Sequence, residues 1–355
     1  MSISKILLIN PFGIGDVLFT TPVIANLKRS NPTVRIDYLS NSRTAEFLRN
    51  DPRVEKIFVY DRDDFLRTYH QSKFLFLKKW KQLFDSLRSE RYDAVIDFSM
   101  NRQFGFLMLL AGAPVRIGFN YKNRGTFLTH SIPLKGYEGK HVVDYYCELL
   151  SLLDVKVKEK KLEIYTSPQE KTWARDWLAQ KGLAGKKNLI AVVPGGGASW
   201  GKEAGLKRWA SENYAELVGK IVEKKNVPII LFGDKLEQEL CQQIARAVNN
   251  LRVITAGETN LAQFAALLEC CHLAITNDGG PLHIAAALGV RSVSIFGPVD
   301  PVVYGPYFLN QHIVIQKALA CQPCYRQFRM SDCQHQNCLR RLSVDDVFRK
   351  VEELL

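Results

Sequence analysis

The chain has 355 residues, of which 46% are hydrophobic and 24% are charged, a balance that excludes disordered and fibrous proteins and allows two globular domains. Its net charge of +12 favours acidic partners: a nucleotide diphosphate, a phosphorylated glycolipid, an anionic membrane or nucleic acid. The longest apolar stretch, residues 104–115, is too short to cross a bilayer. No secretory signal is visible and the eight cysteines suit a reducing compartment, so we expect a cytoplasmic protein.

Strand-like and helix-like stretches alternate along the first half of the chain. Strands are predicted at residues 6–10, 35–39, 56–60, 94–98 and 115–118. Helices are predicted at residues 17–29, 73–87, 103–111 and 142–152. Such alternation indicates a parallel sheet with helices on both faces.

The second half repeats this pattern. Strands are predicted at residues 189–193, 228–232, 252–255, 273–276 and 292–296. Helices are predicted at residues 169–179, 212–223, 235–248, 261–268, 282–288 and 344–355. About ten strands exceed what one doubly wound sheet holds comfortably, so we expect two similar domains, residues 1–165 and 166–355.

A glycine loop follows the first predicted strand and ends in an acid, Gly13-Ile14-Gly15-Asp16. A dinucleotide fingerprint would need a third glycine where Leu18 stands, which disfavours an NAD-dependent oxidoreductase. Asp16 stands at the predicted helix start. It either caps that helix or provides a carboxylate that takes a proton from a substrate hydroxyl.

The most informative stretch is residues 277–283, Asn-Asp-Gly-Gly-Pro-Leu-His, between a predicted strand and a predicted helix. Gly279 and Gly280 expose backbone N–H groups at a helix N-terminus, where amides and the helix dipole hold anions such as a diphosphate. Asp278 and His283 lie beside that position in the sequence. The pattern predicts an anion site at the carboxyl edge of a parallel sheet.

Two further glycine turns follow strands in the second half. One contains Gly196 and Gly197 and continues to Lys207, which either neutralises a diphosphate or is a solvated charge. The other contains Gly233 and Asp234, whose carboxylate either bonds a ribose hydroxyl or caps a helix. Together with residues 277–283, these turns favour a nucleotide ligand.

Four cysteines cluster late in the chain with the spacing C-x2-C-x8-C-x4-C, at Cys321, Cys324, Cys333 and Cys338. Four thiolates at such spacing predict a tetrahedral, structural zinc or iron site. The alternative is a set of reduced cysteines in a loop, or one redox-sensitive pair.

Residues 65–84 contain no acidic residue but many aromatic and basic ones, including Arg67, Lys73, Lys78, Lys79 and Lys81. This segment either contacts an anionic membrane or a phosphorylated lipid acceptor, or packs its aromatic side chains on the sheet. No nucleic-acid-binding motif accompanies the charge, so we expect no nucleic-acid partner.

These motifs together resemble glycosyltransferase family 9, the ADP-heptose:lipopolysaccharide heptosyltransferases. The resemblance runs from Ile6 to about Val347, and its most specific parts are the Gly13–Asp16 loop and residues 277–283. It also includes Thr21-Pro22, Lys207-Arg208-Trp209, Phe296-Gly297-Pro298 with Asp300-Pro301, and Cys321-Gln322-Pro323-Cys324-Tyr325.

The resemblance implies a GT-B fold, in which two Rossmann-like domains of the α/β class face one another across the active site. The amino-terminal domain would bind a saccharide or glycolipid acceptor, such as the lipopolysaccharide core, and the carboxy-terminal domain ADP-heptose or a similar donor. The implied reaction is inverting and independent of metal. Peripheral association with the inner face of the cytoplasmic membrane is also expected.

The resemblance also implies roles for single residues. Asp16 would be the general base, and Lys207 would stabilise the leaving diphosphate. The residues expected to bind substrates are Gly13, Gly15, Gly196, Gly197, Gly233, Asp234, Asp278, Gly279, Gly280 and His283. The chain departs from the family pattern at its triple glycine and at Lys235, so another nucleotide sugar stays an alternative. A sugar-nucleotide or glycolipid-binding protein without catalysis is a further alternative, and the presence of Asp16, Lys207 and His283 argues against it.

Overall fold

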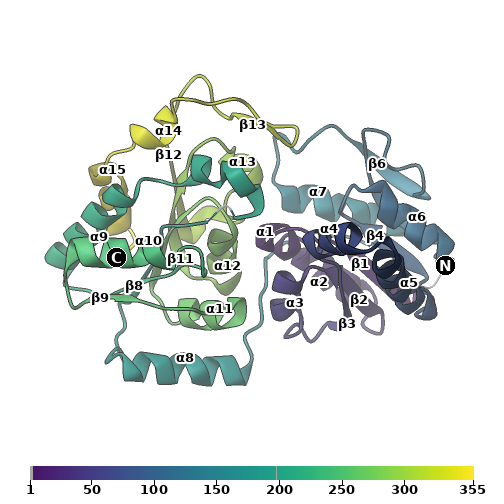
Figure 1. Cartoon of the computed structure of the whole chain (residues 1–355), viewed down its shortest axis with the longest axis horizontal. Helices are drawn as coiled ribbons and strands as arrows, with labels where there is room; N and C mark the ends of the chain where they lie inside the picture. Colours follow the sequence, from purple (N-terminus) through teal and green to yellow (C-terminus); the bar gives the residue numbers. More distant parts are fainter. Residues whose placement is uncertain (1–2, 197) are drawn as a thin grey trace. The chain divides into compact units, whose positions relative to one another are not determined.

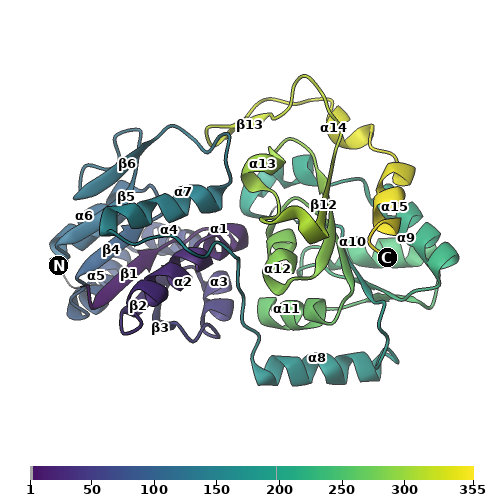
Figure 2. The same cartoon turned by 180° about the vertical axis from the view of Figure 1, so that it is seen from behind.

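The computed structural model describes residues 3–196 and 198–355, and the chain forms two compact units, Met1–Lys161 and Leu162–Leu355 (Figures 1 and 2). Each unit contains a parallel six-stranded sheet with helices packed on it. The predicted α/β class with two Rossmann-like domains is therefore confirmed. None of the helices in the described part of the chain is both long and apolar enough to cross a membrane.

The sheet of the first unit has the strand order β3-β2-β1-β4-β5-β6. Its strands are β1 (Lys5–Ile9), β2 (Arg35–Ser40), β3 (Val54–Val59), β4 (Ala94–Asp97), β5 (Val115–Tyr121) and β6 (His130–Leu134). Its helices are α1 (Ile14–Leu18), α2 (Thr21–Ser30), α3 (Ser42–Leu48), α4 (Arg62–Gln71), α5 (Lys73–Ser89), α6 (Arg102–Leu110), α7 (Val142–Glu148) and the 3-10 helix η1 (Leu149–Leu153).

The sheet of the second unit has the order β12-β11-β10-β7-β8-β9. Its strands are β7 (Ile190–Val193), β8 (Ile229–Leu231), β9 (Val253–Thr255), β10 (Leu273–Asn277), β11 (Arg291–Phe296) and β12 (His312–Gln316). Its helices are α8 (Pro168–Gln180), α9 (Ser211–Lys225), α10 (Gln238–Val248), α11 (Leu261–Glu269), α12 (Gly280–Leu288), α13 (Pro301–Tyr304), α14 (Asn337–Arg340) and α15 (Val344–Glu352), with 3-10 segments η2 (Ala198–Lys207) and η3 (Leu309–Gln311). A short hairpin, β13 (Tyr325–Arg326) and β14 (Arg329–Met330), completes it.

The central strands consist mainly of buried apolar residues. In β1, Leu7 and Ile9 join a core with α5 and α6, and every residue from Ile6 to Ile9 is fully buried. In the second unit, Ile190 and Val192 of β7 join a core with α9 and α15. Continuous apolar runs of this kind are typical of parallel strands between helical layers.

The strand order changes direction between β1 and β4 in the first unit, and between β7 and β10 in the second. In open α/β sheets, ligands bind beside such switch points at the carboxyl ends of the strands. The Gly13–Asp16 loop follows β1, and residues 278–280 follow β10. The fold therefore places both motifs at the edges where ligands are expected.

The predicted helix at residues 17–29 is wrong in one respect, because it is two helices, α1 and α2. Thr20 and Thr21 each donate a side-chain hydrogen bond to a carbonyl three residues earlier, at Val17 and Leu18. Pro22 has no N–H to continue the ladder. Because of this break, α1 is a separate short helix that begins directly after Gly13.

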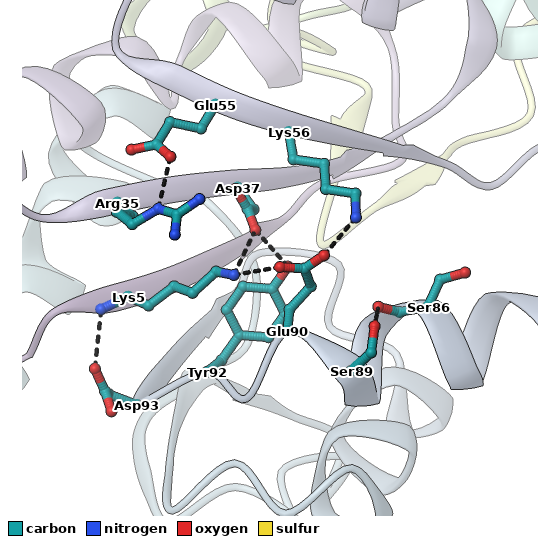
Figure 3. Close-up of polar contacts among 10 residues, drawn as sticks. All are labelled: Lys5, Arg35, Asp37, Glu55, Lys56, Ser86, Ser89, Glu90, Tyr92 and Asp93. Carbon is teal, nitrogen blue, oxygen red and sulfur yellow. Dashed lines mark hydrogen bonds and ion pairs between the residues drawn. The ribbon is translucent and has the colours of Figure 1, made fainter.

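A polar cluster lies at the opposite, amino end of the first sheet (Figure 3). The Tyr92 hydroxyl donates to Asp37 Oδ2 over 2.8 Å, and Lys5 Nζ lies 3.7 Å from the same oxygen. Lys5 also pairs with Glu90. Burial raises the pKa of Asp37, and the bond from Tyr92 opposes this. We assign this cluster to the stability of the sheet, because it lies away from the edge that carries the glycine loop.

Candidate functional site

Three glycine-containing loops meet at the carboxyl edge of the second sheet. Gly195 and Gly196 follow β7, Gly233 follows β8, and the Gly279-Gly280 pair follows β10. Because β10, β7 and β8 are neighbouring parallel strands, their carboxyl ends share one edge. Gly197, also predicted to bind substrate, lies outside the described residues.

Asn277, the last residue of β10, links two of these loops. Its Nδ2 donates to the carbonyl oxygens of Pro194 at 2.8 Å and Gly195 at 2.9 Å. Its Oδ1 accepts from the backbone N–H of Trp209 at 3.1 Å. A buried side chain with all these bonds fixes the β7 loop relative to β10.

Lys207 and Asp278 form a buried ion pair at this edge. The Lys207 Nζ lies 2.6 Å from Asp278 Oδ2, and the side chains are only 8% and 3% exposed. The same Nζ lies 4.3 Å from the centroid of the Trp200 ring. Burial raises the pKa of Asp278, and the positive charge of Lys207 opposes that rise. The alternative of a solvated lysine is therefore wrong.

Helix α12 begins at the end of the β10 loop. Gly279 is its N-cap residue, and Pro281 lies in its first turn, where no N–H is required. His283 is also in this turn and is 4% exposed. The first-turn amides and the helix dipole make this end of α12 suitable for an anion, as the sequence predicted.

A second ion pair, between Glu237 and Arg208, holds the loop after β7 and was not predicted from the sequence. Glu237 Oε1 accepts from the Gly196 N–H at 2.7 Å and from Arg208 Nη2 at 2.8 Å. Arg208 Nε donates to the Gly196 carbonyl at 2.8 Å. Both peptide groups of Gly196 are thus held by one ion pair. Its φ of +105° is a conformation that glycine adopts readily.

Asp234 closes the turn that precedes α10, whose N-cap residue is Glu237. Its exposed carboxylate accepts from the backbone N–H groups of Leu236 at 2.9 Å and Glu237 at 3.2 Å. These bonds lie within the turn, so the alternative in which Asp234 caps the helix is not confirmed. The buried acid of this turn is Glu237, three residues later. Its G-x-x-x-E spacing from Gly233 is the sequence signal that could have found it.

Asp16 is the third residue of α1 and lies at the carboxyl edge of the first sheet. Its Oδ2 accepts from the Gly13 N–H at 3.1 Å, and Asn10 Nδ2 donates to its backbone carbonyl at 3.0 Å. The carboxylate thus closes the first turn, although Gly13 and not Asp16 is the N-cap. Asp16 keeps partial exposure, which a proton-accepting group requires.

Buried ionisable groups surround Asp16. Burial raises the pKa of Tyr38 and Tyr146, and the negative charge of Asp16 adds to both shifts. At the end of the neighbouring strand β4, burial raises the pKa of Asp97 to about 7. The Ser99 N–H donates to Asp97 Oδ1 at 2.8 Å. Asp97 was also missed, although an acid that ends an apolar strand is a visible signal.

The four-cysteine cluster is where the sequence predicts a zinc or iron site. Across residues 3–196 and 198–355, no group of three or more His, Cys, Asp or Glu side chains is arranged to hold a metal ion. Local backbone bonds shape the loop instead, such as the Cys324 N–H to Pro298 O at 2.8 Å. Burial raises the pKa of Cys324 to about 11, which keeps the thiol protonated. The predicted zinc or iron site is not confirmed.

The two Rossmann-like sheets and the glycine loops at their carboxyl edges define a glycosyltransferase of the GT-B class. The family model of glycosyltransferase family 9 (heptosyltransferase) matches residues 80–335. This match covers more than half of the chain, so the protein belongs to glycosyltransferase family 9 and is a glycosyltransferase. The oxidoreductase alternative is therefore wrong.

Named relatives agree with this assignment. Lipooligosaccharide heptosyltransferase 2 of Haemophilus ducreyi is 26% identical over 363 residues, covering 99% of each chain. A family 9 glycosyltransferase structure from Veillonella parvula has a TM-score of 0.83 at 22% identity, covering 100% of this chain and 98% of that one. The E. coli ADP-heptose LPS heptosyltransferase II structure has a TM-score of 0.76 at 24% identity, covering 99% and 98%. These structures share the fold of this chain.

Proposed function

We propose that this protein is an inverting heptosyltransferase that transfers heptose from ADP-heptose to the core saccharide of a lipopolysaccharide or related glycolipid. The observation that carries the proposal is the buried Lys207–Asp278 pair beside the N-terminus of α12. It provides a cation beside the N-terminal amides of a helix at one sheet edge, which is the chemistry that a departing diphosphate needs. Membership of family 9 and the names of the relatives support the choice of heptose and adenine.

The donor half of the proposed reaction depends on neutralising charge. As the bond between the anomeric carbon and the diphosphate breaks, negative charge grows on the leaving phosphate. Lys207 and the first-turn amides of α12 would stabilise that charge, so no metal ion would be required. Asp278 would hold Lys207 in position, and His283 would contact the diphosphate from the same turn.

The acceptor half depends on Asp16. An acceptor hydroxyl would attack the anomeric carbon from the face opposite the diphosphate and lose its proton to the Asp16 carboxylate, which inverts the configuration. The Gly13 N–H bond keeps this carboxylate in one orientation. Gly13 and Gly15 would leave room for the saccharide beside it, because neither has a side chain.

The acceptor proposed here is lipid-linked, so we place the enzyme in the cytoplasm, at the inner face of the cytoplasmic membrane. The names of the relatives support this choice, since they act on lipopolysaccharide or lipooligosaccharide. The net charge of +12 suits both a phosphorylated core and an anionic leaflet.

A thermal-shift screen over ADP, GDP, UDP and NAD tests the donor. Selective stabilisation by ADP supports the proposal, because a ligand that binds only the folded state raises the melting temperature. Turnover of ADP-heptose on a heptose-deficient core, with and without EDTA, then tests the reaction. Binding of ADP without any transfer would favour a nucleotide-sugar-binding protein that lacks catalysis.

A further inference from the structure

Apolar side chains gather on the outer surface of α4 and α5 in the first unit. Phe74 is 74% exposed and Leu77 is 63% exposed. We call this surface the elbow patch; its apolar members are Leu66, Tyr69, Phe74, Leu75 and Leu77, and its basic members are Arg67, Lys73, Lys78 and Lys81. An apolar surface of this kind on a globular protein indicates an interaction site.

The core of the unit does not need these outer residues. Phe65 and Trp80 pack α4 and α5 together, with their ring centroids 5.1 Å apart. Of the patch members, Tyr69 contacts the inner Phe76, with ring centroids 5.2 Å apart. Phe76 and Trp80 also pack against the main core. The alternative in which the aromatic residues pack on the sheet therefore holds for the inner face of α5. That packing does not explain why Phe74 and Leu77 are exposed.

Basic side chains accompany the exposed apolar ones on one helix face. Phe74, Leu77, Lys78 and Lys81 follow the spacing i, i+3, i+4, i+7, which places them on one side of α5. Within the described residues, Lys73 and Lys78 have no acidic partner at ion-pair distance, whereas Lys81 pairs with Asp85 at 2.5 Å. The patch is therefore apolar and positively charged.

The topology places the patch at the edge of the sheet that carries Asp16. Helix α4 follows the carboxyl end of β3, and α5 runs from there back to the start of β4. The bend between them, at Ser72, therefore lies at the carboxyl edge. The Gly13–Asp16 loop leaves β1 at the same edge.

We propose that the elbow patch docks the first unit on an anionic bilayer surface, with Phe74 and Leu77 entering the interface and Lys73 and Lys78 contacting lipid phosphates. Helices that combine exposed aromatic and aliphatic residues with lysines bind membrane interfaces in this way. A second copy of the same patch fits less well, because two basic surfaces repel. The inference rests on the proposed function for one point, the membrane anchoring of the acceptor.

The test is co-sedimentation of the full-length protein with vesicles of phosphatidylcholine alone or mixed with phosphatidylglycerol. We expect binding to the mixed vesicles that weakens at high salt. The double variants Phe74→Ser/Leu77→Ser and Lys73→Glu/Lys78→Glu should each weaken that binding at least about tenfold. Leu251→Ser, a substitution of a leucine that is 99% exposed, and Lys186→Glu/Lys187→Glu serve as matched controls and should bind as the wild type does.

Further measurements keep this test separate from the proposed transfer reaction. The patch variants should retain the wild-type melting temperature, the affinity for ADP and the turnover of a lipid-free core saccharide. Equal vesicle binding by the variants and the wild type would overturn the proposal. A concentration-dependent dimer that Phe74→Ser/Leu77→Ser abolishes would also overturn it, in favour of a second copy. If turnover fails but vesicle binding follows the patch, the failure lies with the proposed function alone.

Discussion

Lys207 and Asp278 hold each other in place at the donor edge of the second sheet, with Nζ and Oδ2 2.6 Å apart and both side chains buried. Lys207 comes from η2, which follows β7, and Asp278 from the loop after β10. The pair therefore joins the same two loops that Asn277 joins through its side-chain amide.

Substituting Lys207 should damage both ligand binding and stability. In Lys207→Ala, the loss of a charged hydrogen bond to the diphosphate should weaken ADP binding by about 10- to 100-fold. The buried carboxylate of Asp278 would lose its partner, at a cost of about 3–5 kcal/mol in the free energy of unfolding. Calorimetric titration with ADP and urea denaturation measure the two effects.

The double variant Lys207→Ala/Asp278→Asn separates these effects. It should recover much of the stability, because no buried charge is left, but not the affinity for ADP. Lys187→Ala, at an exposed lysine, is the matched control. An unchanged dissociation constant for ADP in Lys207→Ala would remove Lys207 from the donor site.

A methyl group at Gly195 should disturb the loop through Glu237. A Cβ at this position would lie 2.2 Å from the Glu237 Cδ, so the carboxylate would have to leave its bonds to Gly196 and Arg208. We expect Gly195→Ala to weaken ADP binding several-fold. Gly205→Ala, where a Cβ meets no atom within 4 Å, should not.

A double-mutant cycle identifies the cause of the Gly195→Ala effect. In a Glu237→Ala background the clash is absent. The further loss of ADP affinity caused by Gly195→Ala should therefore be much smaller there than in the wild type. Equal losses in both backgrounds would show that the methyl group acts on something other than the Glu237 carboxylate.

Asp97 should make the stability of the first unit depend on pH. Its folded pKa, about 7, exceeds the value of about 3.9 for an unfolded aspartate, so the protonated form favours folding. The favourable contribution of Asp97 to the free energy of unfolding is complete below about pH 4 and is lost as the pH rises through about 7. Asp97→Asn removes this titration. Between pH 5 and 8, the free energy of unfolding of the wild type should fall by about 2–3 kcal/mol relative to that of the variant.

Urea denaturation across this pH range provides the comparison. Asp176→Asn, at an exposed aspartate, should follow the wild-type profile. Parallel profiles for Asp97→Asn and the wild type would mean that Asp97 ionises in the folded protein near its ordinary pKa.

Most strands could be predicted from the sequence, including the edge strands β3 and β9, but the edge strands β6 and β12 could not. Strands such as β1 and β10 are short, continuous apolar runs followed by glycine loops, which is a strong local signal. The strands β6 and β12 lie at the sheet edges and carry polar residues, and β6 also includes Pro133. A proline is acceptable at an edge but argues against a strand in the sequence alone.

The site residues divide in a similar way. The glycine loops and Lys207 belong to local motifs, so the sequence located them. Glu237 gains its role from Arg208 and Gly196, which are distant in the chain and meet only in the folded structure. The cysteine spacing predicted which thiols lie near one another, since Cys321, Cys333 and Cys338 all act on the pKa of Cys324, but the predicted metal site is not confirmed.

Heptose transfer by the Asp16→Asn variant shows whether Asp16 is the general base. The asparagine can still accept the Gly13 N–H bond but cannot take a proton, so the fold should survive. With ADP-heptose and a heptose-deficient core, we predict a loss of transfer of about 100-fold or more, with ADP affinity within a few-fold of the wild type. Transfer at the wild-type rate by Asp16→Asn would exclude Asp16 as the general base.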